Sequence, residues 1–223
     1  MSISTIILGQ SGTGKSTSLR NLDPAHTLLI QAVKKPLPFR SIDWRPVVKG
    51  QGGSVFHTDN TDTICAAMRR TDKEVIVIDD FQYILANEFM RRVTDPATGN
   101  QAFAKYNEIA RHAWDVMMCA NELPDYKRIY ILSHTDVDDF GKTKIKTIGK
   151  LLDEKIVLEG LVTIVLKTVV ENGGYKFSTK NSGMDTVKSP MGLFDSDLID
   201  NDLALIDQLI YAYYGLETPK QAA

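Results

Sequence analysis

Short apolar runs that alternate with longer amphipathic stretches dominate the pattern of hydrophobic and polar positions along this chain. The apolar runs have the length of buried β-strands, and turn-forming or acidic residues bound them. A turn at residues 171–174 is expected to join the last two runs into an antiparallel hairpin. We expect strands at residues 5–8, 27–30, 75–78, 128–132, 161–170 and 175–179.

The amphipathic stretches between these runs predict the helices. The first helix begins in a glycine-rich segment and ends near Leu22, because the Asp23-Pro24 pair disfavours helical geometry. Residues 47–48 have the composition of a brief edge strand. Further helices are expected at residues 59–71, 81–93, 101–122 and 200–215, and loops at residues 32–41, 95–100, 136–150 and 180–197.

Strands that alternate with helices are typical of an α/β fold. We therefore predict a three-layer fold with a mostly parallel central sheet and a C-terminal antiparallel hairpin. The length of 223 residues suits one domain, which we place at residues 1–216, followed by a flexible tail at residues 217–223.

Composition narrows the class of protein only in part. A hydrophobic content of 43% and a charged content of 24% indicate an ordinary globular chain, and a net charge of −2 restricts any nucleic-acid binding to a local surface. The N-terminus lacks a basic, apolar leader, so we expect a cytoplasmic protein with no membrane segment. Cys65 and Cys119 are expected to be reduced core thiols, and the histidines show no metal-ligand spacing.

The segment GQSGTGKST carries the most specific chemistry. It matches G-x-x-x-x-G-K-[ST] and follows the apolar run at residues 5–8, a context in which loop N–H groups and a helix N-terminus attract polyphosphate. Lys15 is expected to reach the β- and γ-phosphates of a nucleotide, and the Ser16 hydroxyl to bind Mg²⁺. An ordinary strand-turn-helix that happens to contain glycines is the disfavoured alternative. The predicted nucleotide-binding residues are Gly9, Gln10, Ser11, Gly12, Thr13, Gly14, Lys15, Ser16 and Thr17.

Polar residues follow two of the other predicted strands. The run at residues 75–78 ends in Asp79 and Asp80, a Walker B pattern in which Asp79 would hold Mg²⁺ and Asp80 would orient the attacking water. The run at residues 128–132 is followed by His134, a candidate sensor of the γ-phosphate. The alternatives are an acidic cap on the next helix and a hydrogen-bonded strand end.

A lysine-rich segment follows His134 and is a candidate contact for single-stranded DNA. No aromatic residue interleaves its lysines to supply base stacking, and acidic residues on both sides favour an ordinary solvated loop equally well. The lysines are Lys142, Lys144, Lys146 and Lys150.

Absent motifs exclude several classes of P-loop protein. The chain has no N-K-x-D tetrad of a GTPase, the nearest segment being residues 133–136, and no LSGGQ-like signature of an ABC ATPase. Lysines stand where a small-molecule kinase usually carries an arginine-rich lid. The RecA-like and AAA-like ATPases remain.

Four segments of the chain resemble a family of small bacteriophage P-loop ATPases with a single RecA-like core, related to the phage single-strand annealing recombinases. They are VIDDFQYILANEFMRR, IYILSHTD, KTIGKLLDEKIVLEGLVTIVLKT and DTVKSPMGLF, and the resemblance extends from about Ile6 to Tyr214. It implies binding and hydrolysis of ATP with Mg²⁺, and a role in phage DNA recombination, repair or replication.

The resemblance also implies roles for single residues. It assigns residues 9–17 to the nucleotide, Asp79 to Mg²⁺ and His134 to sensing, and it suggests a homo-oligomer in which Lys180 or Lys188 completes the site of a neighbouring subunit. RecA-type enzymes carry a catalytic glutamate after their second core strand, where this chain reads Ile30-Gln31-Ala32. Asp80 therefore becomes the candidate that activates water, and the proposed catalytic set is Lys15, Asp80 and His134.

Three functions are consistent with these features. The first is a self-assembling ATPase that binds single-stranded DNA through its lysine-rich segment, in the host cytoplasm and with phage replication or recombination proteins as further partners. Because the chain starts at its first strand and ends soon after its last helix, we expect DNA contacts only from core loops. The second is a nucleotide-dependent module that docks a replication or packaging partner and touches no DNA, and the third is a P-loop kinase.

Overall fold

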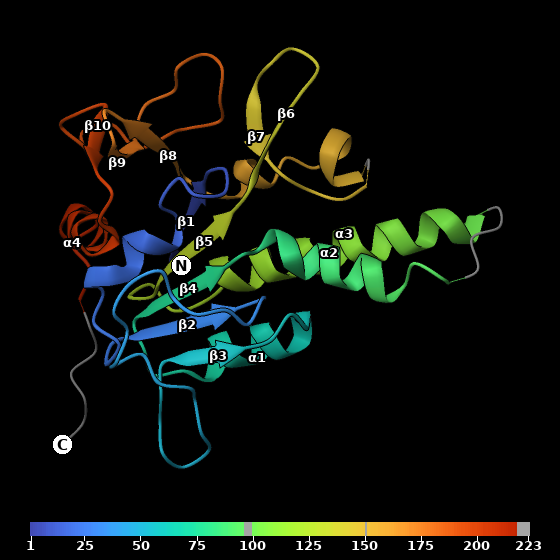
Figure 1. Cartoon of the computed structure of the whole chain (residues 1–223), viewed down its shortest axis with the longest axis horizontal. Helices are drawn as coiled ribbons and strands as arrows, with labels where there is room; N and C mark the ends of the chain where they lie inside the picture. The colour runs from blue at the N-terminus through green and yellow to red at the C-terminus, as the bar shows by residue number, and fades with distance from the viewer. Residues whose placement is uncertain (96–99, 150, 218–223) are drawn as a thin grey trace.

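A twisted sheet with helices on both faces organises the computed structural model, which describes residues 1–95, 100–149 and 151–217 (Figure 1). Within those ranges the sheet has eight strands in the order β10-β9-β8-β1-β5-β4-β2-β3. The strands are β1 (Ile3–Leu8), β2 (Thr27–Gln31), β3 (Val55–His57), β4 (Val75–Asp79), β5 (Arg128–Ser133), β8 (Ile164–Glu171), β9 (Gly174–Ser178) and β10 (Leu198–Asp200).

Strand directions confirm the predicted fold class. All the pairings from β8 through β1, β5, β4 and β2 to β3 are parallel, whereas β8–β9 and β9–β10 are antiparallel. The strand that precedes the glycine-rich loop, β1, is separated from the Walker B strand, β4, by the strand that precedes His134, β5. The molecule therefore has a three-layer α/β P-loop fold with a RecA-like core and an antiparallel C-terminal hairpin.

Alternate residues of each central strand are buried on opposite faces of the sheet. In β4, Ile76 and Ile78 pack into one core, and Val75 and Val77 pack into the other. Buried residues of the helices at Thr61–Arg70, Gln82–Arg91 and Asn100–Asn121 line the first core. Those of a short helix after the glycine-rich loop and of the C-terminal helix line the second. The helices are α1 (Thr61–Arg70), α2 (Gln82–Arg91), α3 (Asn100–Asn121) and α4 (Leu203–Tyr213), with the 3-10 turns η1 (Ser16–Asn21) and η3 (Leu158–Leu161) and the π turn η2 (Leu151–Lys155).

Several predicted boundaries were wrong, and short elements account for most of them. Val48 makes only an isolated bridge to Gly52, and the edge strand is β3, a few residues later. Residues 136–145, expected to belong to a loop, form most of the antiparallel hairpin of β6 (Thr135–Val137) and β7 (Thr143–Ile145). Three-residue strands such as β3, β6, β7 and β10 are too short to show a period of two in the sequence.

The helix after the glycine-rich loop is a six-residue 3-10 turn rather than a full α-helix. Its dipole is correspondingly small, so less of the attraction for anions comes from the helix than the sequence motif suggests. The predicted loop at residues 95–100 and tail at residues 217–223 lie mostly outside the described residues. No helix in the described part of the chain is long and apolar enough to cross a membrane.

Helix α4 is tied to the sheet by a buried ion pair. The Arg128 guanidinium donates from Nε to Asp207 Oδ1 at 2.7 Å and from Nη2 to Oδ2 at 3.0 Å. The Tyr130 hydroxyl donates to the same carboxylate at 2.7 Å. Only 6% of the Arg128 side chain is exposed, so Asp207 compensates a cation that water cannot reach.

We predict that Asp207→Ala lowers the free energy of unfolding by about 3–5 kcal/mol, because it leaves the Arg128 charge buried and unpaired. Urea denaturation of the nucleotide-free protein measures the loss. Asp195→Ala, at an exposed carboxylate, is the control and should change stability by less than about 0.5 kcal/mol. Equal effects of the two substitutions would contradict the assigned role of the pair.

Candidate functional site

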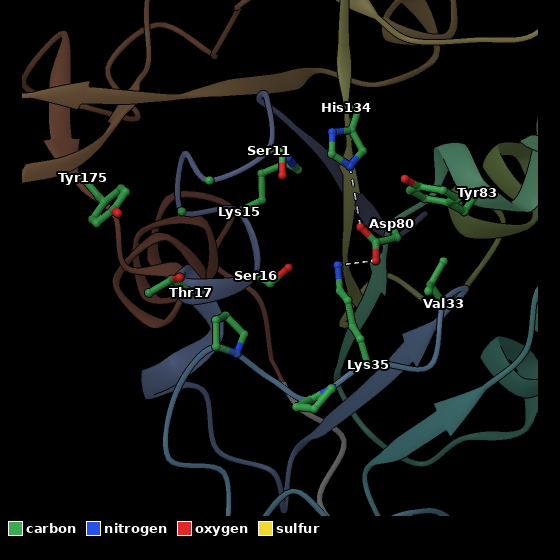
Figure 2. Close-up of a pocket in the computed structure, with 14 residues that line it drawn as sticks. Ser11, Lys15, Ser16, Thr17, Val33, Lys35, Asp80, Tyr83, His134 and Tyr175 are labelled. Atoms are coloured by element: carbon green, nitrogen blue, oxygen red, sulfur yellow. Dashed lines mark ion pairs between the residues drawn. The ribbon is translucent and has the colours of Figure 1, made fainter.

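A cavity of about 760 Å³ opens at the carboxyl ends of the central parallel strands, where α/β folds bind ligands (Figure 2). The glycine-rich loop forms one wall, and the loop after β2 faces it. Residues after β4 and β5 close one end, and a tyrosine of β9 lies at the other. The lining residues are Ser11, Gly12, Gly14, Lys15, Ser16, Thr17, Val33, Lys35, Pro36, Pro38, Asp80, Tyr83, His134 and Tyr175.

Three glycines of the loop are required for different physical reasons. Gly12 and Gly14 have φ angles of 78° and 97°, in the left-handed region that side chains disfavour. At Gly9 a larger residue would clash with a neighbouring strand, since a Cβ there would lie 1.9 Å from Thr168 Oγ1 of β8. The loop shape is therefore fixed both by its own backbone and by the neighbouring strand.

Lys15 is folded over the loop that carries it. Its Nζ donates to the carbonyl oxygens of Gly9 and Gln10, both at 2.8 Å, and the residue is only 6% exposed. Burial lowers the pKa of Lys15 to about 8, so it is mostly cationic at neutral pH. It lines the cavity together with other residues of the loop, as expected for a phosphate-binding lysine.

Ser16 and Asp79 form the best candidate metal site. The Ser16 hydroxyl lies 3.0 Å from each carboxylate oxygen of the fully buried Asp79. Hydroxyl and carboxylate oxygens suit Mg²⁺, which takes few protein ligands in nucleotide sites and completes its shell with phosphates and water. The described residues contain no cluster of three or more His, Cys, Asp or Glu that would hold a metal alone. The donor set thus fits Mg²⁺ held together with a nucleotide.

Asp80 points into the cavity from an unusual backbone conformation. Its φ is 61°, and its carboxylate forms an ion pair with Lys35, Oδ2 to Nζ at 2.5 Å. His134 Nε2 lies 3.9 Å from Asp80 Oδ1, and burial lowers the pKa of His134. Figure 2 shows Asp80 between His134 and Lys35. Two of the three predicted catalytic side chains, Asp80 and His134, are thus brought together at one end of the cavity.

Lys35 is a charged residue of the site that the sequence did not single out. The segment AVKKPLPFRS carries two prolines and several basic residues and indicates only a loop. One signal was available: the loop follows a parallel strand, so it must emerge at the ligand-binding edge of the sheet. Which of its lysines faces the cavity could not be read from the pattern.

The opposite end of the cavity is lined by Tyr175 and Thr17 (Figure 2). Behind it lies Asn201, which is 2% exposed and whose two side-chain polar atoms have no hydrogen-bond partner among the described residues. Tyr175 Cδ1 and Asn201 Oδ1 would lie 3.0 and 3.1 Å from a Cβ built on Gly14. The C-terminal strands therefore meet the phosphate loop directly.

Three of the predicted DNA lysines lie on the β6–β7 hairpin or directly after it, rather than on an irregular loop. Lys142 and Lys146 are exposed, whereas Lys144 is half-buried and stands opposite Asp136 in the strand register. The Lys146 N–H donates to the His134 carbonyl at 2.9 Å, so the hairpin begins at the cavity. Lys150 lies outside the described residues.

The two lysines predicted to act across a subunit interface do not line the cavity. Lys180 forms an exposed ion pair with Asp197, Nζ to Oδ1 at 2.5 Å. The Lys188 backbone pairs with Val165 of β8 through two hydrogen bonds of 2.8 and 3.0 Å. Neither residue contributes to the nucleotide site of its own chain.

The order of the central strands and the phosphate-loop motif together define the fold as that of a RecA-like P-loop NTPase. No protein-family model matches the sequence, and a search of curated proteins finds no match. Among solved structures, the chain is similar to a KaiC-like protein from the hyperthermophilic archaeon Pyrococcus horikoshii OT3, with 11% sequence identity and a TM-score of 0.41. That match covers 78% of this chain and 76% of the other. So weak a likeness carries no argument about function, and the class rests on the strand order and the phosphate loop.

Asp79 supplies a pH-dependent prediction for the nucleotide-free protein. Burial raises its pKa from 3.8 to about 6, so the unfolded chain releases this proton first as the pH rises. The resulting loss of stability grows between those two pH values and is constant above them. Asp79→Asn removes it and should raise the free energy of unfolding by about 2–3 kcal/mol at pH 8.

Denaturation at pH 8 and near pH 3.5 checks this expectation. The two proteins should nearly converge at the lower pH, where Asp79 is protonated in the folded state and mostly protonated in the unfolded chain. Asp195→Asn, at an exposed carboxylate, should have little effect at either pH. A destabilised Asp79→Asn variant at pH 8 would show that the hydrogen bonds from Ser16 outweigh the burial cost.

Proposed function

We propose that this protein binds ATP with Mg²⁺ and hydrolyses it, and that it acts on single-stranded DNA in phage recombination, repair or replication. One observation carries the proposal: His134 lies at the nucleotide cavity and directly precedes the hairpin that bears the exposed lysines. A change at the phosphate end of the cavity can therefore reach the hairpin through one short stretch of backbone.

The cavity supplies the groups that hydrolysis of a phosphoanhydride requires. Loop N–H groups and Lys15 would hold the β- and γ-phosphates, and Ser16 and Asp79 would hold Mg²⁺, which neutralises charge on the phosphate oxygens. Asp80 would orient water so that its oxygen bonds to the γ-phosphorus. The bond from that phosphorus to the bridging oxygen then breaks, ADP leaves with the electron pair, and the water proton passes to Asp80 or to the released phosphate.

The tip of the hairpin supports the DNA part of the proposal. Phe140 stands at the turn and is 88% exposed, close to the exposed Lys142. An exposed aromatic ring beside cations suits a single strand, because the ring stacks on bases while the lysines contact phosphates. This aromatic residue precedes the lysines rather than interleaving them, which is why the sequence pattern did not suggest stacking.

The assembly part of the proposal rests on the family resemblance. We propose a homo-oligomer in the host cytoplasm in which Lys180 or Lys188 approaches the nucleotide of a neighbouring subunit, with phage replication or recombination proteins as further partners. The location of both lysines outside their own cavity is compatible with that role.

A partner-docking module without DNA binding is the second candidate, and the same hairpin favours it. Val137 and Phe140 are exposed on the hairpin, and the half-exposed Met184 lies next to Gly141. Asp138 and Asp136 offset part of the lysine charge there. An apolar surface with mixed charge suits a protein partner as well as it suits a nucleic acid.

We predict that Lys15→Ala lowers ATP hydrolysis by at least about 100-fold, because it removes the cation at the β- and γ-phosphates. Release of inorganic phosphate measures the loss, and circular dichroism should show an unchanged fold. Lys49→Ala, at an exposed lysine outside the cavity, should retain full activity. Phosphate transfer to a nucleoside or nucleotide instead of water would indicate a kinase.

The DNA part predicts that replacing Lys142, Lys144 and Lys146 with alanine weakens binding of single-stranded DNA. For each phosphate that the variant no longer neutralises, the slope of log affinity against log salt should also become shallower by about 0.7. Fluorescence anisotropy at several salt concentrations measures both quantities. Alanine at the exposed Lys34, Lys49 and Lys155 gives a control of equal charge. Unchanged affinity in the hairpin variant, or no DNA binding by the unaltered protein, would favour the docking module.

A further inference from the structure

Lys35 is a cation in the nucleotide cavity that the phosphate-loop motif does not account for. It comes from the loop after β2, which leaves the sheet beside β4, where Gln31 is in register with Asp79. Four residues of that loop line the cavity: Val33, Lys35, Pro36 and Pro38. Figure 2 shows the Lys35 side chain extending from the loop to Asp80, with Ser16 on one side and Val33 on the other.

The two partners of the Lys35–Asp80 ion pair differ in solvent exposure. The Asp80 side chain is 4% exposed and that of Lys35 is 41% exposed. Because Asp80 and Asp79 together outweigh the effect of burial, the pKa of Lys35 is raised and the amine is cationic. The Lys35 side chain is flexible and partly exposed, so its ammonium group can change partners at little cost in free energy. The Asp80 carboxylate is on a short, buried side chain and has little freedom to move.

Chemistry places the terminal phosphate close to this pair. Ser16 and Asp79 would hold a metal that neutralises charge on the phosphates of a nucleotide, and Asp80 directly follows Asp79 and lines the same cavity. The terminal phosphate of a nucleotide bound there would lie near the Asp80 carboxylate, which would repel it. Lys35 is the cavity lysine paired with that carboxylate, whereas Lys15 is held by the loop carbonyls.

We propose that Lys35 is a γ-phosphate ligand that this chain supplies to its own site. Without nucleotide it is held by Asp80; when ATP binds, it exchanges Asp80 for the γ-phosphate and leaves the carboxylate free to orient water. The exchange rests on the proposed function and gives it a specific property: the protein distinguishes ATP from ADP through the loop after β2, the strand whose end lacks the expected glutamate.

The test compares Lys35→Ala with Lys34→Ala, which removes the same charge from the exposed neighbouring residue outside the cavity. Calorimetric titration with Mg²⁺ and either ADP or a non-hydrolysable ATP analogue gives the affinities. Lys35→Ala should weaken binding of the analogue about 10- to 100-fold, the range for removal of a charge-assisted hydrogen bond, and leave ADP binding within about twofold. Lys34→Ala should change neither, and Lys35→Arg should restore most of the preference for the analogue.

A second variant tests the exchange of partners. Asp80→Asn should lower the hydrolysis rate but preserve or tighten binding of the analogue, because Lys35 is then released in advance. Equal weakening of ADP and analogue by Lys35→Ala, or no weakening, would overturn the role of Lys35 while leaving the ATPase proposal intact. If the unaltered protein binds neither nucleotide, the proposed function itself is wrong, and the role of Lys35 fails with it.

Discussion

The carboxylate of Asp79, fully buried at the end of β4, is the constraint on which the rest of the site depends. Ionisation at that position is unfavourable without compensating groups, and burial raises its pKa to about 6. Ser16 approaches it from the phosphate loop, and the lysines at positions 15 and 35 contribute positive potential from opposite walls. A metal-bound nucleotide would complete the compensation. Without such a ligand, the buried carboxylate lowers the stability of the fold, as is common where a side chain is kept for binding rather than for stability.

The sequence predicted the parts of this structure that depend on strong local patterns. The apolar runs of β1, β4 and β5 and the glycine pattern at residues 9–14 indicated the parallel core and the location of the cavity, whereas the order of the strands comes from the structure alone. The position of Lys35 could not be predicted, because only tertiary structure determines which side chain of an irregular loop turns inward. The β6–β7 hairpin was missed for a different reason: its strands are held by cross-strand pairing and by contacts with the segment around Met184, not by hydrophobic alternation.

The arrangement joins four segments that are separate in the sequence. The phosphate loop, the loop after β2 and the residues that follow β4 and β5 all reach the cavity because parallel strands place their carboxyl ends along one edge. Asp80, with its left-handed backbone, and His134 occupy adjacent positions at that edge. Strained backbone at such a position is common where a side chain must point at a ligand.

The close approach of Gly9 to Thr168 has a consequence for how this protein can vary. A strand from the last third of the chain packs against the loop near its beginning, so a larger residue at position 9 would require changes at Thr168 and also at Thr13, whose Oγ1 would lie 2.7 Å from the added Cβ. The same third supplies Tyr175 and Asn201 against Gly14. Removal of β8 and β9 would thus take away not just an edge of the sheet but the surface that shapes the phosphate loop. We therefore expect that substitutions in the N-terminal motif and in the C-terminal hairpin have to be made together.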